Sequence, residues 1–500
     1  MNESSATAVF PDWKAPAAEG EILISPQARQ ILAHTAENHR RLSSDQKTTL
    51  SSVPLAEVRK RMRRVADIAE DELAIFSGHQ TELYHCGVWA KDALTTSAAA
   101  KMPGAAAWRL AVDTDQPKHL TLRWPFGSLP ITDDPRINSA AWSGLLNGPT
   151  SEHLQQLQIE YSNAASGWGF EPLAGRFLQE FPDGSLSSAL TAGIANLNQD
   201  LGLADRPILI SSLLDCAPYL LFAWHFLSDA AGMAKAYNQA LADFRKINKV
   251  RSPTRPMPDL VLTEDLCEIP FWLDDLATGN RRRAALERVS ADKWGLNAGG
   301  DVLHCCEVRA WEAAEKLQSF LREHNLRLSP RALTLTLFVR LLLADQFVHG
   351  IGGGRYDRVT DALIVSRFHI APPAFCVTTA TLFFPSAAQR DRVCIPCLKQ
   401  EGHRLSHSIL GDEKMEMVRR IGALPRNSAD RQLLFGQMHG RLAAAGLDHP
   451  DLRRWQEKWE EAQLQSQWEQ TLFDRELFFA LQPRTRLVEL LGKYQAEFAG

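Results

Sequence analysis

Short apolar runs alternate with helical stretches along this chain, and this alternation restricts its fold more than any other feature. The apolar run 73–76 ends at Ser77 and Gly78, as a buried strand ends, and the residues after Gly87 can form a helix. A second strand candidate follows at 107–112. A strand, a helix and a strand in this order predict a parallel pair joined by a right-handed crossover.

The alternation continues in the middle of the chain. Residues 207–211 form another strand candidate, and a helical stretch runs from 219 to about 249. We therefore predict an α/β fold with a Rossmann-like, doubly wound parallel sheet as its core. The run 269–273, a turn at 278–280 and the three arginines after it predict a hairpin that elaborates the core.

The length of 500 residues exceeds that of a usual single domain. We expect an N-terminal arm and helices over 1–70, the Rossmann-like core with insertions over 71–385, and a C-terminal helical hairpin or coiled coil over 386–500. The basic run 59–64 predicts a solvated helix face. In the last segment, large apolar residues recur about once per helical turn: Trp455, Trp459, Leu464, Trp468 and Leu472. Such an appendage either packs on the core or pairs two copies into a homodimer.

Charge and composition exclude several classes of partner. A net charge of −4 gives no overall field for nucleic acid or for an anionic membrane surface. The first residues lack a basic region followed by an apolar run, and the longest apolar stretches are short or interrupted by charge, so we expect a cytoplasmic chain with no membrane span. Small molecules are the expected partners.

The cysteines give no disulfide or metal signature. Eight cysteines in a long chain without an export signal predict reduced thiols. Cys394, Cys397, His403 and His407 have the residue types of a zinc site, but strong zinc patterns have longer separations or a second cysteine pair. We therefore assign no metal ligands.

A glycine, histidines and a lysine crowd into residues 76–91, directly after the first strand candidate. A strand, a glycine turn and a helix start form a natural anion seat, because the first amides of a helix have no internal partner. In this interpretation Gly78 lets a ligand approach the backbone, His79 and Gln80 orient it, and Lys91 supplies positive charge. The alternative is an ordinary helix cap with a surface lysine.

His85, Cys86 and Gly87 extend this candidate site. They match part of the His-x-Gly-His signature of nucleotidyl-transferring Rossmann-like enzymes, whose histidines stabilise charge on phosphate. Val88 stands where that signature has its last histidine, so the match is partial.

Acidic residues follow the second strand candidate. Asp113 and Asp115 would lie at the carboxyl end of the sheet, where open parallel sheets bind ligands, and His119 is close in sequence. Two neighbouring carboxylates can have different proton affinities, which leaves one able to act as a general base. The alternative is an acidic turn that caps the next segment.

A third candidate is the glycine-rich stretch 347–361. Gly350, Gly352, Gly353 and Gly354 precede a helix that carries Arg355, Tyr356 and Asp357. Successive amides without side chains can wrap an anion. The stretch lacks the Gly-Lys-Ser/Thr ending of a P-loop and follows no clear strand, so it is not a standard nucleotide fingerprint. The alternative is that these glycines serve close packing.

In their order, the motifs resemble those of the bacillithiol-biosynthesis cysteine-adding enzymes. Those ligases carry a strand, a Gly-Gln-Gln turn, a Gly-Pro segment and a lysine, to which 77–80, 85–87 and Lys91 are similar. They then have a strand that leads into a Glu-Asp-His-Asp element, which 111–115 resembles.

A later part of the chain continues the resemblance. The family has a helix that ends in a Gly-Gly-Pro-Gly/Ala-Glu loop, and 328–356 looks like this region. The chain also departs from the family. His79 replaces a glutamine, the acidic element lacks its internal histidine, and 354–357 replaces the acidic ending.

The resemblance implies a Rossmann-like core, a coiled-coil appendage, dimerisation, and amide formation between the carboxylate of cysteine and the amine of glucosaminyl malate. The departures point to a divergent branch that acts on another amine. Such chemistry needs anion clamps and a base. Lys91 and Arg355 are candidate clamps, His85, Asp113 and Asp115 are candidate bases, and ATP or ADP with Mg²⁺ is the candidate cofactor.

Two other classes of function stay open from the sequence. One is a noncatalytic Rossmann-like scaffold that binds a nucleotide or a partner through its tryptophan-rich C-terminal helices. The other is a nucleotidyltransferase similar to the pantothenate-synthesis ligases, which would release pyrophosphate from ATP and a carboxylic acid.

Overall fold

The computed structural model describes residues 12–255, 257–290, 293–298, 300–304, 310–385, 394–447 and 449–499. The chain forms two compact units. The first consists of Met1–Arg123, Gly127–Leu382 and Arg475–Gly500, and the second of Trp124–Phe126 and Phe383–Asp474. The C-terminal residues therefore belong to the same unit as the N-terminal helices, whereas the sequence predicted three consecutive segments.

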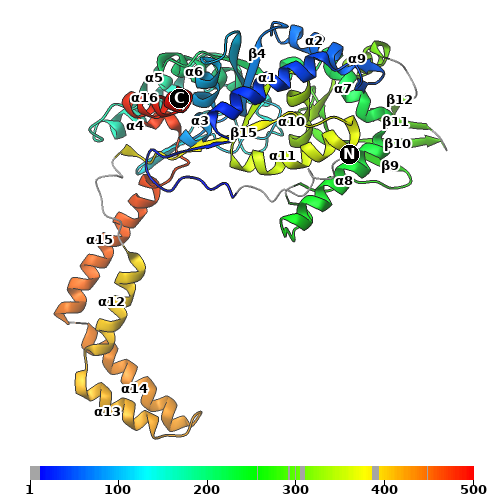
Figure 1. The fold of residues 1–500 in the computed structure, drawn as a ribbon. Coiled ribbons are helices and arrows are strands. Elements are labelled where there is room, and N and C mark those ends of the chain that lie inside the picture. The colour runs from blue at the N-terminus through cyan, green and yellow to red at the C-terminus, as the bar shows by residue number, and fades with distance from the viewer. Residues whose placement is uncertain are drawn as a thin grey trace. The chain divides into compact units, whose positions relative to one another are not determined.

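A six-stranded, mostly parallel sheet forms the centre of the first unit in the described chain (Figure 1). Its order is β1-β15-β14-β4-β5-β8, and the last five strands are mutually parallel. The α/β prediction is confirmed at this level. The strands are β1 (Ile22–Ser25), β4 (Leu73–Gln80), β5 (Ala105–Val112), β8 (Asp205–Leu209), β14 (Gln346–His349) and β15 (Phe375–Ala380).

The predicted parallel pair of β4 and β5 is present, but β4 is longer than the sequence suggested. The predicted strand stopped before Ser77, whereas pairing with β5 continues to Gln80, which lies opposite Val112. Gly78 is therefore a strand residue and not part of a turn. A Cβ at Gly78 would lie 3.1 Å from the ring of Phe347, so this glycine leaves room for a side chain from the neighbouring strand.

Helices pack on both faces of the sheet. Side chains of β4 and β5 contact α3 (Cys86–Ala99) and α6 (Leu186–Asp200) on one face, as Ser77 does with Asp92 of α3. On the other face, His349 of β14 contacts Asp357 of α11 (Ile351–Leu363). The aromatic rings of Phe76 and Trp108 stack on this second face with centroids 5.8 Å apart.

A second sheet, antiparallel, has the order β12-β11-β10-β9-β13. The predicted hairpin is confirmed, because β9 and β10 pair antiparallel around the turn that precedes Arg281. The strands are β9 (Leu266–Asp275), β10 (Arg281–Ser290), β11 (Lys293–Ala298), β12 (Asp301–His304) and β13 (Leu326–Pro330).

The basic run 59–64 is not a fully solvated face, contrary to the prediction. Arg59 and Arg63 lie on α2 (Leu55–Val65), and only 1% and 3% of their surfaces are exposed. Both donate to Asp345, which directly precedes β14. The positive charges of Arg59 and Arg63 are therefore compensated by Asp345, a buried carboxylate far along the chain. The basic run by itself had predicted that these charges face water.

The remaining described elements around these sheets include two small two-stranded sheets, and helices that cover the larger sheets. Every residue of α7 from Pro218 to Trp224 is buried, as expected for a core helix. These elements are β2 (Thr49–Leu50), β3 (Val53–Pro54), β6 (Thr121–Trp124), β7 (Gly127–Pro130), α1 (Ala28–Ser44), α4 (Ser151–Ala165), α5 (Ala174–Gln179), α7 (Ala217–Ser228), α8 (Ala230–Ile247), α9 (Trp311–Glu323), α10 (Ala332–Leu342), α16 (Arg484–Glu497), and the short helical turns η1 (Ser143–Leu145), η2 (Ile210–Leu213), η3 (Ile364–Phe368) and η5 (Phe479–Leu481).

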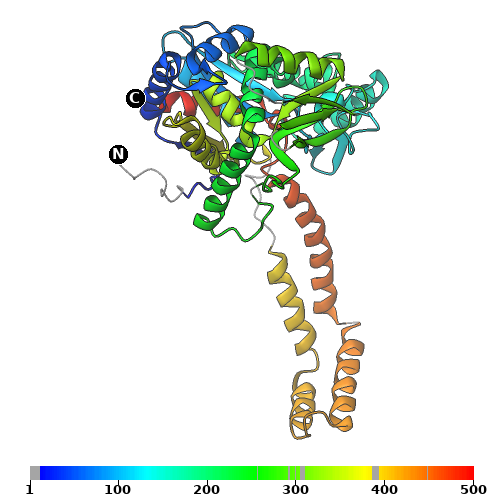
Figure 2. The same cartoon turned by 90° about the vertical axis from the view of Figure 1, so that its right-hand side faces the viewer.

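The second unit consists mainly of helices α12 (Ile395–Ser408), α13 (Gly411–Gly422), α14 (Ala429–Gly446) and α15 (Pro450–Leu472). Figure 2 shows α12 beside α15 and α13 beside α14. Trp455 stacks on Trp459 and donates to the carbonyl of Leu398 at 2.9 Å. The side chains of Leu464 and Trp468, which the sequence placed in the same stripe, lie outside the described part. None of the described helices is long and apolar enough to span a membrane.

Candidate functional site

The carboxyl ends of β4, β5 and β14 meet at one edge of the sheet. β4 lies between β5 and β14, so the chain leaves β4 toward one side of the sheet and later returns on the other side. Val348 pairs with Ser77, which places His349 beside Gly78. Two strands whose connections run to opposite sides leave a crevice at their carboxyl ends, where open α/β sheets bind ligands.

A pocket opens at this edge on the face covered by α3 and α6. Gly78, His79, Gln80 and Lys91, which the sequence singled out together, all line it. The cavity is small: its volume of about 10 Å³ is at the lower limit for a single water molecule. The predicted grouping of these four residues therefore has a physical counterpart.

Lys91 is a buried lysine and not the surface lysine of the alternative interpretation. Only 4% of its surface is exposed, and its ammonium group donates to the carbonyl oxygen of Gly78. Burial lowers the pKa of Lys91 to about 8, although Asp92 and Glu82 oppose the shift. The amine can therefore exchange a proton near neutral pH.

His79 lies beside Lys91 in the same pocket. Its Nδ1 is 3.3 Å from the carbonyl oxygen of Gln80 and 3.6 Å from a carboxylate oxygen of Glu82. Burial, together with the charge of Lys91, lowers the pKa of His79 well below its usual range. The imidazole is therefore neutral at pH 7. His119 comes close through its backbone, since its amide donates to Glu82 at 3.2 Å.

A buried polar network supports the floor of the pocket. Asp92 accepts from Ser77 at 2.6 Å and from Tyr84 at 2.9 Å. Burial and the nearby Asp205 raise the pKa of Asp92, although Arg109 opposes them. Sequence reasoning missed Asp92 and Arg109. The signal that was available is that Asp92 follows Lys91 directly on a helix with few exposed positions.

The two predicted aspartates have different surroundings. Asp113 accepts from the backbone amide of Ser211 at 3.0 Å and from its hydroxyl at 2.5 Å, and so ties β5 to η2. Asp115 accepts from the side-chain amide of Gln80 at 2.6 Å. Only Asp115 therefore contacts a residue that lines the pocket.

His85 caps α3, as the alternative interpretation of this segment expected. Its Nδ1 accepts from the amide of Gly87 at 3.0 Å. The side chain of His85 therefore caps the N-terminus of α3. A Cβ at Gly87 would lie 2.6 Å from Arg475 and from Thr379. Arg475, which the sequence did not single out, donates to the carbonyl of Ala380 at 2.9 Å. Its distance along the chain left no local signal.

The glycine-rich stretch directly follows a strand, which the sequence did not predict. β14 ends at His349, Gly350 is the N-terminal cap residue of α11, and Gly352 lies in the first turn. The four glycines have two roles. A Cβ at Gly350 or Gly352 would meet no atom within 4 Å, whereas Gly353 and Gly354 are closely packed. No side chain caps α11, so the first amides are open to an anion.

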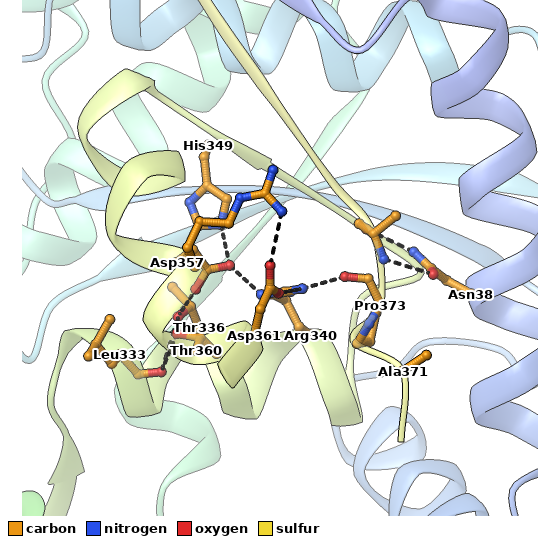
Figure 3. A network of polar contacts seen from close by, with 12 residues as sticks. Asn38, Leu333, Thr336, Arg340, His349, Asp357, Thr360, Asp361, Ala371 and Pro373 are labelled. Atoms are coloured by element: carbon orange, nitrogen blue, oxygen red, sulfur yellow. Dashed lines mark hydrogen bonds and ion pairs between the residues drawn. The ribbon is translucent and has the colours of Figure 1, made fainter. Parts of the chain in front are cut away.

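The three residues after the glycines have separate contacts. Arg355 donates to the carbonyl of Trp13 at 2.5 Å, and Tyr356 is 40% exposed with its ring near Phe244. Asp357 is buried and accepts from Arg340 and His349, as Figure 3 shows. None of the three lines the pocket on the α3 face.

The predicted residues thus lie along one edge of the sheet but not in one cavity. Gly78, His79, Gln80 and Lys91 share the pocket on the α3 face. The stretch from Gly350 follows the neighbouring strand, next to α11 on the opposite face.

The cysteine prediction is wrong at one place. Cys394 and Cys397 form a disulfide, which is feasible because their Cα atoms are 5.2 Å apart at the start of α12. The described free cysteines are Cys86, Cys216, Cys267 and Cys376, while Cys305 and Cys306 lie outside the described residues. In the described ranges, no group of three or more His, Cys, Asp or Glu side chains could hold a metal ion.

No family model matches the sequence, and no curated protein matches it.

Proposed function

We propose that the chain is a ligase that forms an amide bond between the carboxylate of cysteine, or a similar amino acid, and a small amine such as a sugar amine. The observation that carries this proposal is the pairing of Lys91 and His79 in one pocket, across the sheet edge from the open N-terminus of α11. A carboxylate needs a leaving group before an amine can displace it, so such a ligase needs proton-transfer groups and an anion seat. Both occur at the carboxyl edge of the sheet, on opposite faces.

The strand order supports a Rossmann-like core for this ligase. In chain order the five parallel strands are β4, β5, β8, β14 and β15, and their order in the sheet is 3-2-1 followed by 4-5. This is the arrangement of doubly wound nucleotide-binding folds, whose ligands lie where the order reverses. The reversal occurs between β4 and β14, at the crevice that the proposed reaction would use.

A nucleoside triphosphate is the activating co-substrate in this proposal. The uncapped start of α11, with open space at Gly350 and Gly352, suits a phosphate group. When bound, the nucleotide would supply the leaving group for the carboxylate. Mg²⁺ binds largely through phosphates and water, and we assign no residue to it.

We also propose that the helices of the second unit pair two copies of the chain. Large apolar side chains are exposed on α13 and α14, where the small core of this unit does not cover them. Leu433 is 61% exposed and Phe435 is 52% exposed. Such side chains favour association with another apolar surface.

The ligase proposal is tested by incubating the purified chain with cysteine, an amino sugar conjugate of malate and ATP. We expect an amide product by mass spectrometry and release of phosphate or pyrophosphate that depends on both substrates. Pyrophosphate release with a carboxylic acid but without amide would favour a nucleotidyltransferase. If Lys91→Ala keeps full cellular function while deletion of 394–474 abolishes it, the chain is a scaffold and the ligase proposal fails.

A further inference from the structure

His349 lies at the carboxyl edge of the sheet, where the strand order reverses between β4 and β14. It is the last residue of β14, and 5% of its surface is exposed. Its Nε2 lies 2.9 Å from a carboxylate oxygen of Asp357 on α11. The rings of Phe347 and Phe375 pack against the imidazole with centroids 4.6 and 5.0 Å away. The ring is therefore fixed in one orientation.

Asp357 is held as an ionised partner for this histidine. Arg340 of α10 donates to it at 2.5 Å and Thr336 donates at 2.6 Å, as Figure 3 shows. Burial raises the pKa of Asp357, but Arg340 foremost, together with the hydrogen bond from Thr336, brings the pKa below its usual range. A carboxylate at Nε2 favours the tautomer with its proton on Nε2, which leaves the lone pair on Nδ1.

The Nδ1 atom of His349 faces the start of α11. A Cβ built on Gly353 would lie 2.9 Å from this nitrogen, and Gly353 belongs to the first turn of the helix. Within the described residues, Nδ1 makes no hydrogen bond. This nitrogen, which makes no hydrogen bond in the described residues, thus lies against a helix start that no side chain caps.

We propose that His349 is a catalytic residue, with Nδ1 as the proton acceptor, and that Asp357 is its positioning residue. This inference rests on the proposed ligase function. The ligand class is a carboxylic acid activated as a mixed anhydride with phosphate, whose phosphate group binds the first amides of α11.

The step at this site is an acyl transfer. The amine nitrogen forms a bond to the acyl carbon, and the bond between that carbon and the phosphate oxygen breaks. The electron pair of that bond leaves with the phosphate group, and the proton of the attacking amine moves to Nδ1. The nucleoside triphosphate of the proposed function supplies the anhydride, so no further reactant is needed.

The test uses full-length His349→Gln and Asp357→Asn in the amide-forming assay. General-base catalysis contributes about 10²–10⁴-fold, so we expect each variant to lose kcat on this scale with a smaller change in KM. Asp357, with Arg340 behind it, is the charged group that faces the ring, and the other flanks are the aromatic rings of Phe347 and Phe375. His349→Gln should therefore remove the acidic limb of the pH–rate profile. His153→Gln, on α4, is the control and should keep that limb.

A purely structural histidine would give a different result. Its loss would lower activity equally at every pH and lower the melting temperature, with the acidic limb retained. That outcome, or a kcat of His349→Gln equal to that of the wild type, would overturn the assignment.

A second readout does not depend on turnover. In ¹⁵N-histidine-labelled protein, inorganic phosphate should shift the Nδ1 resonance of His349, identified by its absence in His349→Gln. No shift at any phosphate concentration would overturn the anion site. If the wild type forms amide and His349→Gln forms it equally fast, only the catalytic role of His349 is rejected, and the ligase proposal stands. If the wild type forms no amide although His349 responds to phosphate, the ligase proposal fails, and the catalytic role fails with it.

Discussion

Arg59 donates to Asp345 at 2.5 Å, and both side chains are almost fully buried. The same carboxylate accepts from Arg63 at 3.1 Å and from the backbone amide of Ala74 at 2.8 Å. One aspartate therefore joins α2, the start of β4 and the start of β14. This junction lies at the amino end of the strands, opposite the edge that carries the candidate site.

Replacement of Asp345 should destabilise the fold strongly. Asp345→Asn leaves two buried guanidinium groups without their counter-charge, and loss of one partner of a buried ion pair costs about 3–5 kcal/mol. Urea unfolding at pH 7 measures the difference. Glu57→Gln, which removes the exposed i,i+4 pair with Arg61 on the same helix, is the control and should change stability by about 0.2–0.5 kcal/mol. Equal effects of both substitutions would contradict this account.

The effect of Asp345 should also depend on pH. Burial raises its pKa, but Arg59, His39 and Arg63 together outweigh burial, and the folded pKa lies below the unfolded value near 3.8. The ionised carboxylate therefore stabilises the fold above the unfolded pKa, and this stabilisation is lost as the pH falls through the folded pKa. The gap in unfolding free energy between wild type and Asp345→Asn should be constant above about pH 5 and shrink below it. A gap that widens in acid would refute the assignment.

Lys91 should titrate well below an ordinary lysine. We expect one lysine side-chain resonance with a midpoint near the pKa of about 8 in a carbon-detected NMR titration of ¹³C-lysine-labelled protein. Lys91→Met should remove that resonance and leave the others in place. A midpoint at or above 10.5, the ordinary value, would show that the amine is solvated and would remove the support it gives to the ligase proposal.

Gly87 should tolerate no side chain. A Cβ there would meet Arg475 and Thr379 at 2.6 Å, and overpacking of this kind costs about 1–3 kcal/mol. Gly492→Ala, on an open face of α16, is the matched control and should stabilise the protein by up to about 1 kcal/mol. Thermal unfolding of the two variants compares them directly. A stabilised Gly87→Ala would mean that the contacts around this helix start are looser than described.

An acidic residue on the exposed apolar surface of α14 should separate the copies. Phe435→Asp should shift the protein from dimer to monomer in sedimentation velocity, because a charge cannot be buried there without a partner. Val488→Asp, on α16 of the first unit, should leave the dimer intact. A wild-type chain that is monomeric at all concentrations would exclude the proposed pairing.

Local patterns were sufficient for those parts of the fold whose signal lies in one stretch of sequence. The apolar runs predicted β5 and β8, and the turn at 278–280 predicted the hairpin of β9 and β10. β14 was missed because it has only four residues and runs into glycines without a polar break.

The candidate site was predictable only where its residues are close in sequence. Gly78, His79, Gln80 and Lys91 were grouped correctly because one strand and the next helix carry them. The burial of Arg59 was not predictable, because its partner Asp345 lies far along the chain. Sequence reasoning also did not single out His349. Its partners Arg340 and Asp357 lie on two other elements, so no local pattern pointed to it.

The outer strand β1 comes from the beginning of the chain, yet its hydrogen-bonding partner β15 ends at Ala380. During synthesis β1 must therefore wait until most of the polypeptide has left the ribosome before it can pair. Until then β1 has no partner strand, and in a chain without β1 the edge of β15 would be exposed to other chains. Molecules that lack the first 25 residues should consequently be prone to edge-to-edge aggregation even if their remaining sheet is intact.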